Sequence, residues 1–372
     1  MKKLILVSPK NRTVYNFRGD LIRQFQSEGY EVVVTGPNRD DIDKVTALGV
    51  RFVEVPMAKN GTNPFSDLSY RKRLKQLFLN ERPDVVLSYT IKPVIYGSWA
   101  AASAGVNNIN AMVTGVGYTF LAKSLKAKIL RRIVFFLYRR GLKRAHHVIF
   151  QNKDDLSLFT CHNLVQKEKC SVVNGSGVNM SHFTPQPFPK HSGSLRFFML
   201  SRLLKSKGVT EYLQAAEIIK KKYPDVHFSL LGKYETQMQD AVSSDYVKRF
   251  IDEGIIEKYE ETTDVRPYYA SSDVYVLPSY GEGTPRTVLE AMATGRPILT
   301  TDANGCRETV IDGENGFLVP VGDAKALAEK MCWLVEHPEF VRTMGQRSLD
   351  VCREKYAVDK VNHRLFEIME IK

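Results

Sequence analysis

Short apolar runs alternate with longer amphipathic segments through the first half of the chain. Strands are expected at residues 3–7, 31–35, 51–55, 85–87, 147–151 and 171–173, and helices at residues 21–28, 40–48 and 67–80. A polar loop is expected at residues 8–19, after the first strand. Alternation of this kind predicts βαβ units and a parallel sheet.

A second series of strand-like runs follows a stretch rich in Gly, Ser and Pro. Its strands are expected at residues 196–200, 227–231, 274–277 and 297–300, and a last amphipathic helix covers the C-terminal end. At 372 residues the chain is long enough for two domains with separate cores. The pattern therefore predicts an α/β protein with an N-terminal domain at 1–175, a linker at 176–190, a second domain at 191–356 and a final helix at 357–372.

The stretch from Ser279 to Pro297 carries the clearest chemical signal. Glu282 lies in a Gly-rich turn after the strand at 274–277, and Glu290 lies within a helix expected at 286–294. A helix N-terminus suits a diphosphate, and carboxylates accept hydrogen bonds from sugar or ribose hydroxyls. The motif therefore suits a sugar nucleotide, although two glutamates on such a unit also fit a solvated surface.

A second polar segment follows the strand at 196–200. It contains Arg202 and Lys207 and ends at Gly208. Open α/β sheets bind ligands at the carboxyl ends of their strands, where an Arg and a Lys can neutralise a departing diphosphate. A basic surface loop is the alternative interpretation.

Taken together, these motifs resemble the donor site of retaining glycosyltransferases with the GT-B fold, in particular glycosyltransferase family 4. The family carries an Arg, a Lys and a Gly about eighty residues before its Glu-x7-Glu motif, and both occur here in that order. Gly177, Val178, Asn179, Phe183 and Pro185 also match its interdomain passage. The resemblance implies two Rossmann-like domains whose parallel sheets face each other across a cleft, with the last helix returning to the N-terminal domain.

The resemblance also implies an activity. It is the metal-independent transfer, with retention, of a hexose or N-acetylhexosamine from a UDP-sugar to a lipid-diphosphate-linked sugar. Similar bacterial enzymes act on undecaprenyl-diphosphate-linked sugars in the synthesis of O-antigen, capsule or N-glycan precursors. No cofactor or metal is expected, because no Asp-x-Asp motif stands in the right place.

Individual roles follow from the resemblance. The catalytic candidates are Arg202, Lys207 and Glu282. The donor-binding candidates are Gly232, Lys233, Arg266, Gly283, Thr284, Pro285, Arg286, Thr287 and Glu290. The acceptor-side candidates are Asn16, Arg18, Tyr89, Thr90, Lys92, Gly115, Gly117 and Tyr118. Residues 88–97 contain no histidine, although many relatives carry one there near the reacting sugar.

The net charge of +12 indicates an acidic partner. Every charged residue from 123 to 145 is basic, and apolar residues alternate with them. Such a helix suits an anionic membrane surface, with Lys126, Arg131, Arg132, Arg139 and Arg140 as candidate contacts. Equally, it fits a solvated helix whose stripe of Ile129, Ile133 and Phe136 faces the core.

The amino-acid composition narrows the class of protein further. Apolar residues make up 43% and charged residues 25%, as in globular proteins, and no apolar run reaches the roughly 18 residues of a membrane-spanning helix. The apolar start is too short for a signal peptide, so we expect a cytoplasmic protein attached peripherally to the inner membrane. The five scattered cysteines fit neither disulfides nor zinc.

Two other classes remain open from the sequence. One is a sugar-nucleotide epimerase or hydrolase of the same fold. The other is a basic protein without enzymatic activity that binds nucleic acid or a membrane, which would explain the charge but not the carboxylate motif. We expect no nucleic-acid partner.

Overall fold

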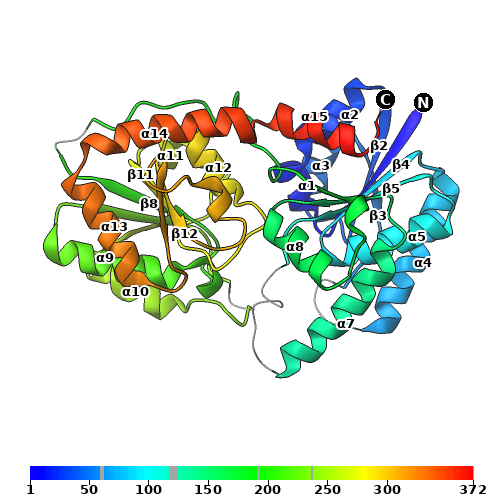
Figure 1. The fold of residues 1–372 in the computed structure, drawn as a ribbon, viewed down its shortest axis with the longest axis horizontal. Helices are drawn as coiled ribbons and strands as arrows, with labels where there is room; N and C mark the ends of the chain where they lie inside the picture. Colours follow the sequence, from blue (N-terminus) through cyan, green and yellow to red (C-terminus); the bar gives the residue numbers. More distant parts are fainter. Residues whose placement is uncertain (59–62, 117–124, 191–192, 236–237, 372) are drawn as a thin grey trace. The chain divides into compact units, whose positions relative to one another are not determined.

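The computed structural model describes residues 1–58, 63–116, 125–190, 193–235 and 238–371 and contains two compact α/β units. The first unit comprises Met1–Ser176 and Asp359–Lys372, and the second comprises Gly177–Val358. Each unit contains one sheet with helices packed on it (Figure 1). The predicted α/β architecture with two parallel sheets is confirmed.

The sheet of the first unit has seven parallel strands in the order β3-β2-β1-β4-β5-β6-β7. The strands are β1 (Lys2–Val7), β2 (Tyr30–Gly36), β3 (Arg51–Glu54), β4 (Val85–Tyr89), β5 (Asn108–Val113), β6 (His147–Phe150) and β7 (Cys170–Val172). The helices are α1 (Asn11–Phe17), α2 (Gly19–Ser27), α3 (Ile42–Thr46), α4 (Pro64–Glu81), α5 (Ser98–Ser103), α7 (Leu125–Leu142) and α8 (Lys153–Cys161), with a π-helical turn at Pro93–Gly97.

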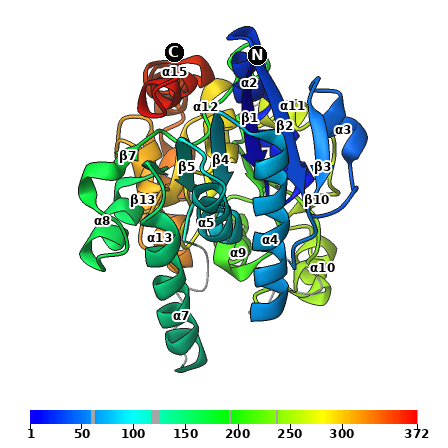
Figure 2. The ribbon, with the colours of Figure 1, turned by 90° about the vertical axis from the view of Figure 1, so that its right-hand side faces the viewer.

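Successive side chains of β1 enter two different cores, one on each face of this sheet. Ile5 and Val7 pack with residues of α4 and α7, whereas Leu4 and Leu6 pack with residues of α2 and of α15 (Val358–Ile368). Because both faces are covered, the strands are continuously apolar, as is usual in parallel sheets. Figure 2 shows α4, α5 and α7 in front of the strands of this sheet.

The C-terminal helix α15 packs within the first unit. The ring of Phe366 lies 4.5 Å from that of Phe25 on α2, measured between centroids. The side-chain amide of Asn108 donates a 2.7 Å hydrogen bond to the carbonyl of Met369. Apolar burial and this hydrogen bond together hold the end of the chain against the first sheet.

The sheet of the second unit has six parallel strands in the order β10-β9-β8-β11-β12-β13. The strands are β8 (Arg196–Leu200), β9 (His227–Leu231), β10 (Glu257–Tyr259), β11 (Val274–Leu277), β12 (Ile298–Thr301) and β13 (Gly316–Val319). The helices are α9 (Val209–Lys222), α10 (Ser244–Asp252), α11 (Arg266–Ala270), α12 (Arg286–Ala293), α13 (Ala324–Glu336) and α14 (Glu339–Val351).

The expectation of a polar loop at residues 8–19 is wrong, because this stretch contains helix α1. Its N-cap, Lys10, makes no side-chain capping bond. The helix is held instead by tertiary contacts: Val14 is buried, and the side-chain amide of Asn11 donates to the carbonyls of Asn38 and Asp40 at 2.9 and 2.6 Å. Contacts distant in sequence therefore decide the local structure.

The stretch expected as a linker makes extensive contacts with the second unit. Val178 donates its backbone N–H to the carbonyl of Tyr356 at 2.8 Å. The fully buried guanidinium of Arg296 donates to the carbonyls of Gln186 and Pro187 at 3.2 and 3.0 Å. Residues 177–190 are therefore part of the second unit's packing.

All five cysteines are free thiols. Among the helices that the structure describes, none combines the length and the apolar character that crossing a bilayer requires.

Candidate functional site

Two loops meet at the carboxyl ends of neighbouring strands in the second unit. One follows β8 and includes residues 201–208, and the other follows β11 and includes residues 278–285. Gly208 has a φ of +73°, and a β-carbon there would lie only 2.0 Å from the carbonyl oxygen of Pro278. The carbonyl of Ser206 accepts hydrogen bonds from the backbone N–H of Tyr280 at 2.9 Å and from the hydroxyl of Ser279 at 3.2 Å.

This close approach joins two of the catalytic candidates. The ammonium of Lys207 forms a salt bridge with the carboxylate of Glu282, and both side chains are largely buried. The hydroxyl of Ser279 donates to the same carboxylate at 2.9 Å, and the backbone N–H of Glu282 donates to the carbonyl of Asn304 at 2.9 Å. Arg202 lies on the first loop, with its guanidinium 3.8 Å from Glu235 and half of its side chain exposed.

Helix α12 continues the site from the second loop. Pro285 is its N-cap and Arg286 its first residue, and Gly295 follows its end with a φ of +80°. Glu290 faces Arg286, with 3.2 Å between Oε1 and Nε, and accepts a 3.1 Å hydrogen bond from the hydroxyl of Tyr269. Burial raises the pKa of Glu290, and the attraction of Arg286 works against that rise.

The remaining donor-side candidates have varied surroundings. Gly283 is buried. Thr284, in the loop before α12, and Thr287, in the first turn of that helix, are half-buried. Gly232 follows β9 and packs against the carbonyl of Ser201, and the side chain of Lys233 is exposed. Arg266 donates two 2.8 Å hydrogen bonds to Asp264 and holds the pKa of that carboxyl down to about 2.

On the first unit, two of the acceptor-side candidates belong to a buried network. The hydroxyl of Tyr89 lies 2.7 Å from that of Ser8 and 2.8 Å from that of Thr13. The guanidinium of Arg18, only 3% exposed, lies 5.0 Å from the centroid of the Tyr89 ring and 3.1 Å from the sulfur of Met112. The network gives Arg18 a role in packing beneath the surface, whereas Asn16 is exposed.

The next acceptor-side candidates follow β4. Thr90 has a φ of +68°, an unusual conformation for a β-branched residue, and is half-buried. Lys92 forms hydrogen bonds inside the first unit: its ammonium donates to Asp67 at 2.7 Å and to the carbonyl of Ala58 at 2.9 Å. Gly115 has a φ of +117°, whereas Gly117 and Tyr118 lie outside the described residues.

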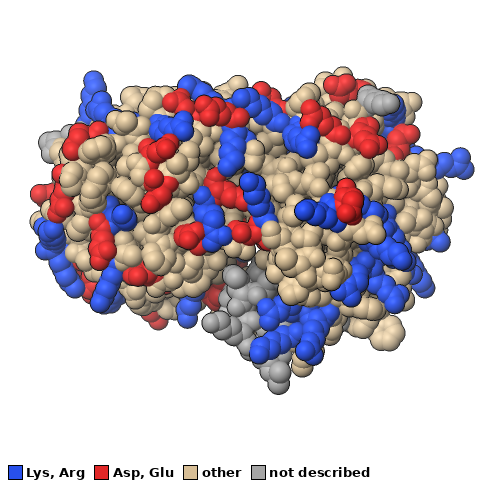
Figure 3. Space-filling view, viewed as in Figure 1, with Lys and Arg blue, Asp and Glu red and all other residues tan. Residues whose placement is uncertain are grey.

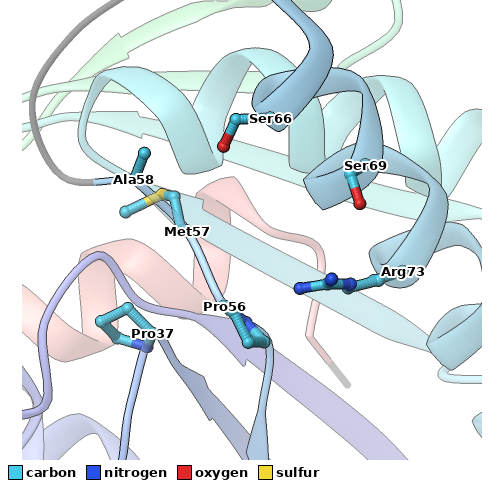
Figure 4. A pocket seen from close by; sticks show the side chains of 7 residues that line it. All are labelled: Pro37, Pro56, Met57, Ala58, Ser66, Ser69 and Arg73. Atoms are coloured by element: carbon cyan, nitrogen blue, oxygen red, sulfur yellow. The ribbon is translucent and has the colours of Figure 1, made fainter. Parts of the chain in front are cut away.

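An open hollow of about 450 Å³ lies near the carboxyl ends of β2 and β3 (Figure 4). Pro37, Pro56, Met57 and Ala58 line it from the loops, and Ser66, Ser69 and Arg73 line it from α4. Figure 4 shows the guanidinium of Arg73 directed toward the side of Pro56. Sequence reasoning missed this hollow, because its lining comes from segments far apart in the chain.

Helix α7 does have a core-facing apolar side, as the alternative interpretation expected, but the residues proposed for that side are wrong. Ile129, Ile133 and Phe136, proposed as its core-facing stripe, are 53%, 46% and 53% exposed, whereas Tyr138 and Leu142 are buried in the core. Lys and Arg side chains gather around this part of the first unit (Figure 3).

The membrane candidates on α7 differ in their contacts. Arg132, Arg139 and Arg140 are exposed, and Arg131 is half-buried. Arg139 donates to the carbonyls of Asn163 and His162, and Arg140 stacks on Phe136 at 4.8 Å. The side chain of Lys126 lies outside the described residues.

Several residues that support the site gave no clear signal in the sequence. Ser279 and Tyr269 bind the two glutamates, and Thr301 donates to the carbonyl of Ser279. Gly305 has a φ of +73°, and a β-carbon there would lie 2.3 Å from the carbonyl oxygen of Gly283. The Asn-Gly pair at 304–305 was the available signal, because this dipeptide is typical of turns with positive φ.

The described part of the chain contains no group of three or more His, Cys, Asp or Glu side chains that could hold a metal ion.

Two Rossmann-like units, with cations and carboxylates on the loops at the carboxyl ends of the second sheet, define the GT-B class of fold. A family model described as "Glycosyl transferase 4-like" matches residues 3–152, and one described as "Glycosyl transferases group 1" matches residues 194–337. The chain belongs to this family of glycosyltransferases, and it is a glycosyltransferase.

Relatives support the same assignment over most of the chain. An N,N'-diacetylbacillosaminyl-diphospho-undecaprenol alpha-1,3-N-acetylgalactosaminyltransferase of Campylobacter jejuni is 28% identical, over 89% of this chain and 88% of the relative. A UDP-Gal:alpha-D-GlcNAc-diphosphoundecaprenol alpha-1,3-galactosyltransferase of Escherichia coli is 26% identical, over 78% of this chain and 75% of the relative.

Solved structures share the fold. Anabaena Alr3699/HepE in complex with UDP-glucose superposes with a TM-score of 0.81, at 17% identity and over the whole of both chains. A glycosyltransferase of Rickettsia africae superposes with a TM-score of 0.80, at 18% identity, over 99% of this chain and 98% of the other.

Proposed function

We propose that this glycosyltransferase transfers a hexose or N-acetylhexosamine, with retention at the anomeric carbon, from a UDP-sugar to a sugar on a lipid diphosphate. The reaction belongs to the synthesis of a bacterial surface glycan. It proceeds without a metal ion, since Arg202 and Lys207 supply the positive charge that the departing UDP requires.

The observation that carries the donor half of the proposal is the pairing of Lys207 with Glu282 on two adjoining loops. A cation and a carboxylate are held side by side, next to the N-terminus of α12, whose backbone N–H groups favour an anion. In the proposed mechanism Lys207 and Arg202 bind the diphosphate and stabilise the charge that develops on it as the glycosidic bond breaks. Glu282 binds sugar hydroxyls and Glu290 binds the ribose.

The acceptor half draws on the relatives and on the first unit. The names of the Campylobacter and Escherichia relatives both specify sugars on diphospho-undecaprenol. In the first unit, the hollow lined by Arg73 and two serines offers a cation and two hydroxyls at the ligand-binding edge of a parallel sheet. Such a lining suits an anionic or hydroxylated part of the acceptor.

The proposed association with a membrane rests on α7. Exposed arginines surround Ile129, Ile133 and Phe136, which are about half exposed. A surface that combines basic and apolar side chains binds anionic bilayers by charge and by insertion of its apolar groups. We therefore place the enzyme peripherally on the cytoplasmic face of the inner membrane, where a lipid-linked acceptor is accessible.

The donor proposal is tested by measuring transfer with a panel of UDP- and GDP-sugars. Lys207→Met should lower kcat by about 10²- to 10³-fold, the usual loss when one group that stabilises a developing anion is removed. Added EDTA should leave the rate unchanged. Full activity of the Lys207→Met enzyme would refute the donor assignment, and release of an altered free sugar without a transfer product would indicate an epimerase or hydrolase.

The membrane proposal is tested by sedimentation with vesicles of phosphatidylcholine and phosphatidylglycerol. Replacing Arg132 and Arg140 with Gln should weaken binding, because about 1 kcal/mol is lost for each basic residue near an anionic surface. The matched control replaces Lys248 and Lys325, two exposed lysines of the second unit. Equal loss in both double variants would contradict a role for α7.

A further inference from the structure

The ring of Trp99 on α5 is contacted by two arginines that are far apart in the sequence. The guanidinium carbon of Arg71, on α4, lies 4.3 Å from the centroid of the ring, and that of Arg144, just after α7, lies 4.8 Å from it. All three side chains are partly exposed. Three helices that lie beside one another therefore bring two cations to one aromatic group.

Two like charges held at one ring repel each other, and the contacts with the indole hold them there despite that repulsion. Neither arginine has a carboxylate partner among the described residues. Asp67, one turn before Arg71, is taken by Lys92 and Tyr96. Arg144 donates one hydrogen bond, to the carbonyl of Arg140. Within the part of the chain that the structure describes, no carboxylate thus compensates the charge of the pair.

The geometry suits a phosphate. Because both guanidinium carbons lie within 4.8 Å of the same centroid, they are less than 10 Å apart, so one phosphate group beside the ring can accept charge-assisted hydrogen bonds from the N–H groups of both. Contact with the ring also restricts the side chains of both arginines, which reduces the entropy lost when they bind an oxyanion. Neighbouring Lys72 and Lys143 are exposed and add to the positive potential.

We propose that Arg71, Trp99 and Arg144 form a binding site for a phosphate group. The site lies on α4, on α5 and just after α7, and none of its residues belongs to the donor loops or lines the hollow of Figure 4. Its ligand is the phosphate of an anionic membrane lipid or of a soluble phosphomonoester. The site does not depend on which sugar or acceptor the enzyme uses.

Tryptophan fluorescence gives a direct test, since the chain has only two tryptophans. In a Trp333→Phe protein, Trp99 is the remaining fluorophore. Emission is measured during titration with glycerol 3-phosphate and, separately, with phosphatidylcholine vesicles that contain or lack phosphatidylglycerol. We expect a saturable change in emission, and co-sedimentation or dialysis should measure the same affinity without relying on the fluorophore.

Substitutions distinguish a specific phosphate site from a general effect of positive charge on phosphate binding. Arg71→Gln and Arg144→Gln should each weaken binding at least tenfold, and Arg71→Lys should also weaken it although the charge is kept. The adjacent replacements Lys72→Gln and Lys143→Gln remove the same charge from residues that do not contact Trp99 and should have little effect.

A response to glycerol 3-phosphate that needs both arginines would support the site with a soluble ligand. A response only to phosphatidylglycerol vesicles, again requiring both arginines, would support it with a lipid ligand. Equal effects of the arginine and lysine replacements, an unchanged affinity in Arg71→Lys, or no response to either probe would overturn the proposal.

Discussion

The loop contact at Gly208 offers a sharp test of how the donor site is built. Gly208→Ala would place a β-carbon 2.0 Å from the carbonyl oxygen of Pro278, so the two loops would have to separate. Because Lys207 precedes this glycine, the pairing of Lys207 with Glu282 should be disturbed. We expect a loss of both stability and transfer activity.

A second glycine of the same unit supplies the matched control. Gly254 has a φ of +68°, close to the +73° of Gly208, but a β-carbon there would meet no atom within 4 Å. Gly254→Ala should therefore carry only the cost of a left-handed alanine, about 1–2 kcal/mol. Gly208→Ala carries that cost and also that of forcing a methyl group against backbone, about 1–3 kcal/mol more.

Urea unfolding can isolate this effect in the second unit. In a Trp99→Phe background, Trp333 on α13 is the remaining tryptophan and reports on that unit. The free energy of unfolding should fall further in Gly208→Ala than in Gly254→Ala, and only Gly208→Ala should lose most of its transfer rate. Equal destabilisation of the two variants, or full activity of Gly208→Ala, would refute the reasoning about the loops.

Two predictions concern the first unit. Thr90→Gly should raise the free energy of unfolding by about 1 kcal/mol, because the strain of a β-branched residue at φ +68° exceeds the entropic cost of glycine; calorimetry that shows destabilisation would contradict this. Hydrogen bonds from Arg51, the larger contribution, and from Lys3 lower the pKa of Glu81 to about 2. Its folded pKa is below the ordinary value near 4.5, so its contribution is present above that pH and is lost as pH falls toward 2. Glu81→Gln should therefore reduce stability by up to about 1 kcal/mol at neutral pH and have little effect near pH 2, as measured by urea titrations at both pH values.

Much of the fold was predictable because parallel strands buried on both faces are continuous apolar runs. The strands at 196–200, 227–231 and 274–277 have the bounds expected from the sequence. Helix α7 shows the limit of such patterns. It carries apolar residues on more than one side, so periodicity predicts a helix but does not select Tyr138 and Leu142 over Ile129 and Ile133 as the buried stripe.

The site was predictable to a similar degree. Residue types and spacing indicated Lys207 and Glu282 separately, but their contact depends on β8 lying beside β11, which is a property of strand order. The burial of Arg18 was not predictable, because the stacking of its guanidinium on Tyr89 arises from segments far apart in sequence. Tertiary contacts of this kind leave little trace in local sequence.

On the basis of the proposed function, we expect the ion pairs of the donor site to rearrange when it binds its ligand. Two cations of the site are paired with carboxylates, Lys207 with Glu282 and Arg286 with Glu290. A diphosphate that binds Lys207 must compete with Glu282 for the ammonium, and the same exchange leaves the carboxylate available to sugar hydroxyls. Glu282→Gln removes the competitor, so UDP should bind about tenfold more tightly, as expected when a competing charge-assisted hydrogen bond of about 1.5 kcal/mol is lost, while transfer slows. Calorimetric titration with UDP measures the first effect and a transfer assay the second. Weaker binding of UDP to the variant would show that Glu282 holds Lys207 in place for the diphosphate, and that the two groups do not exchange partners.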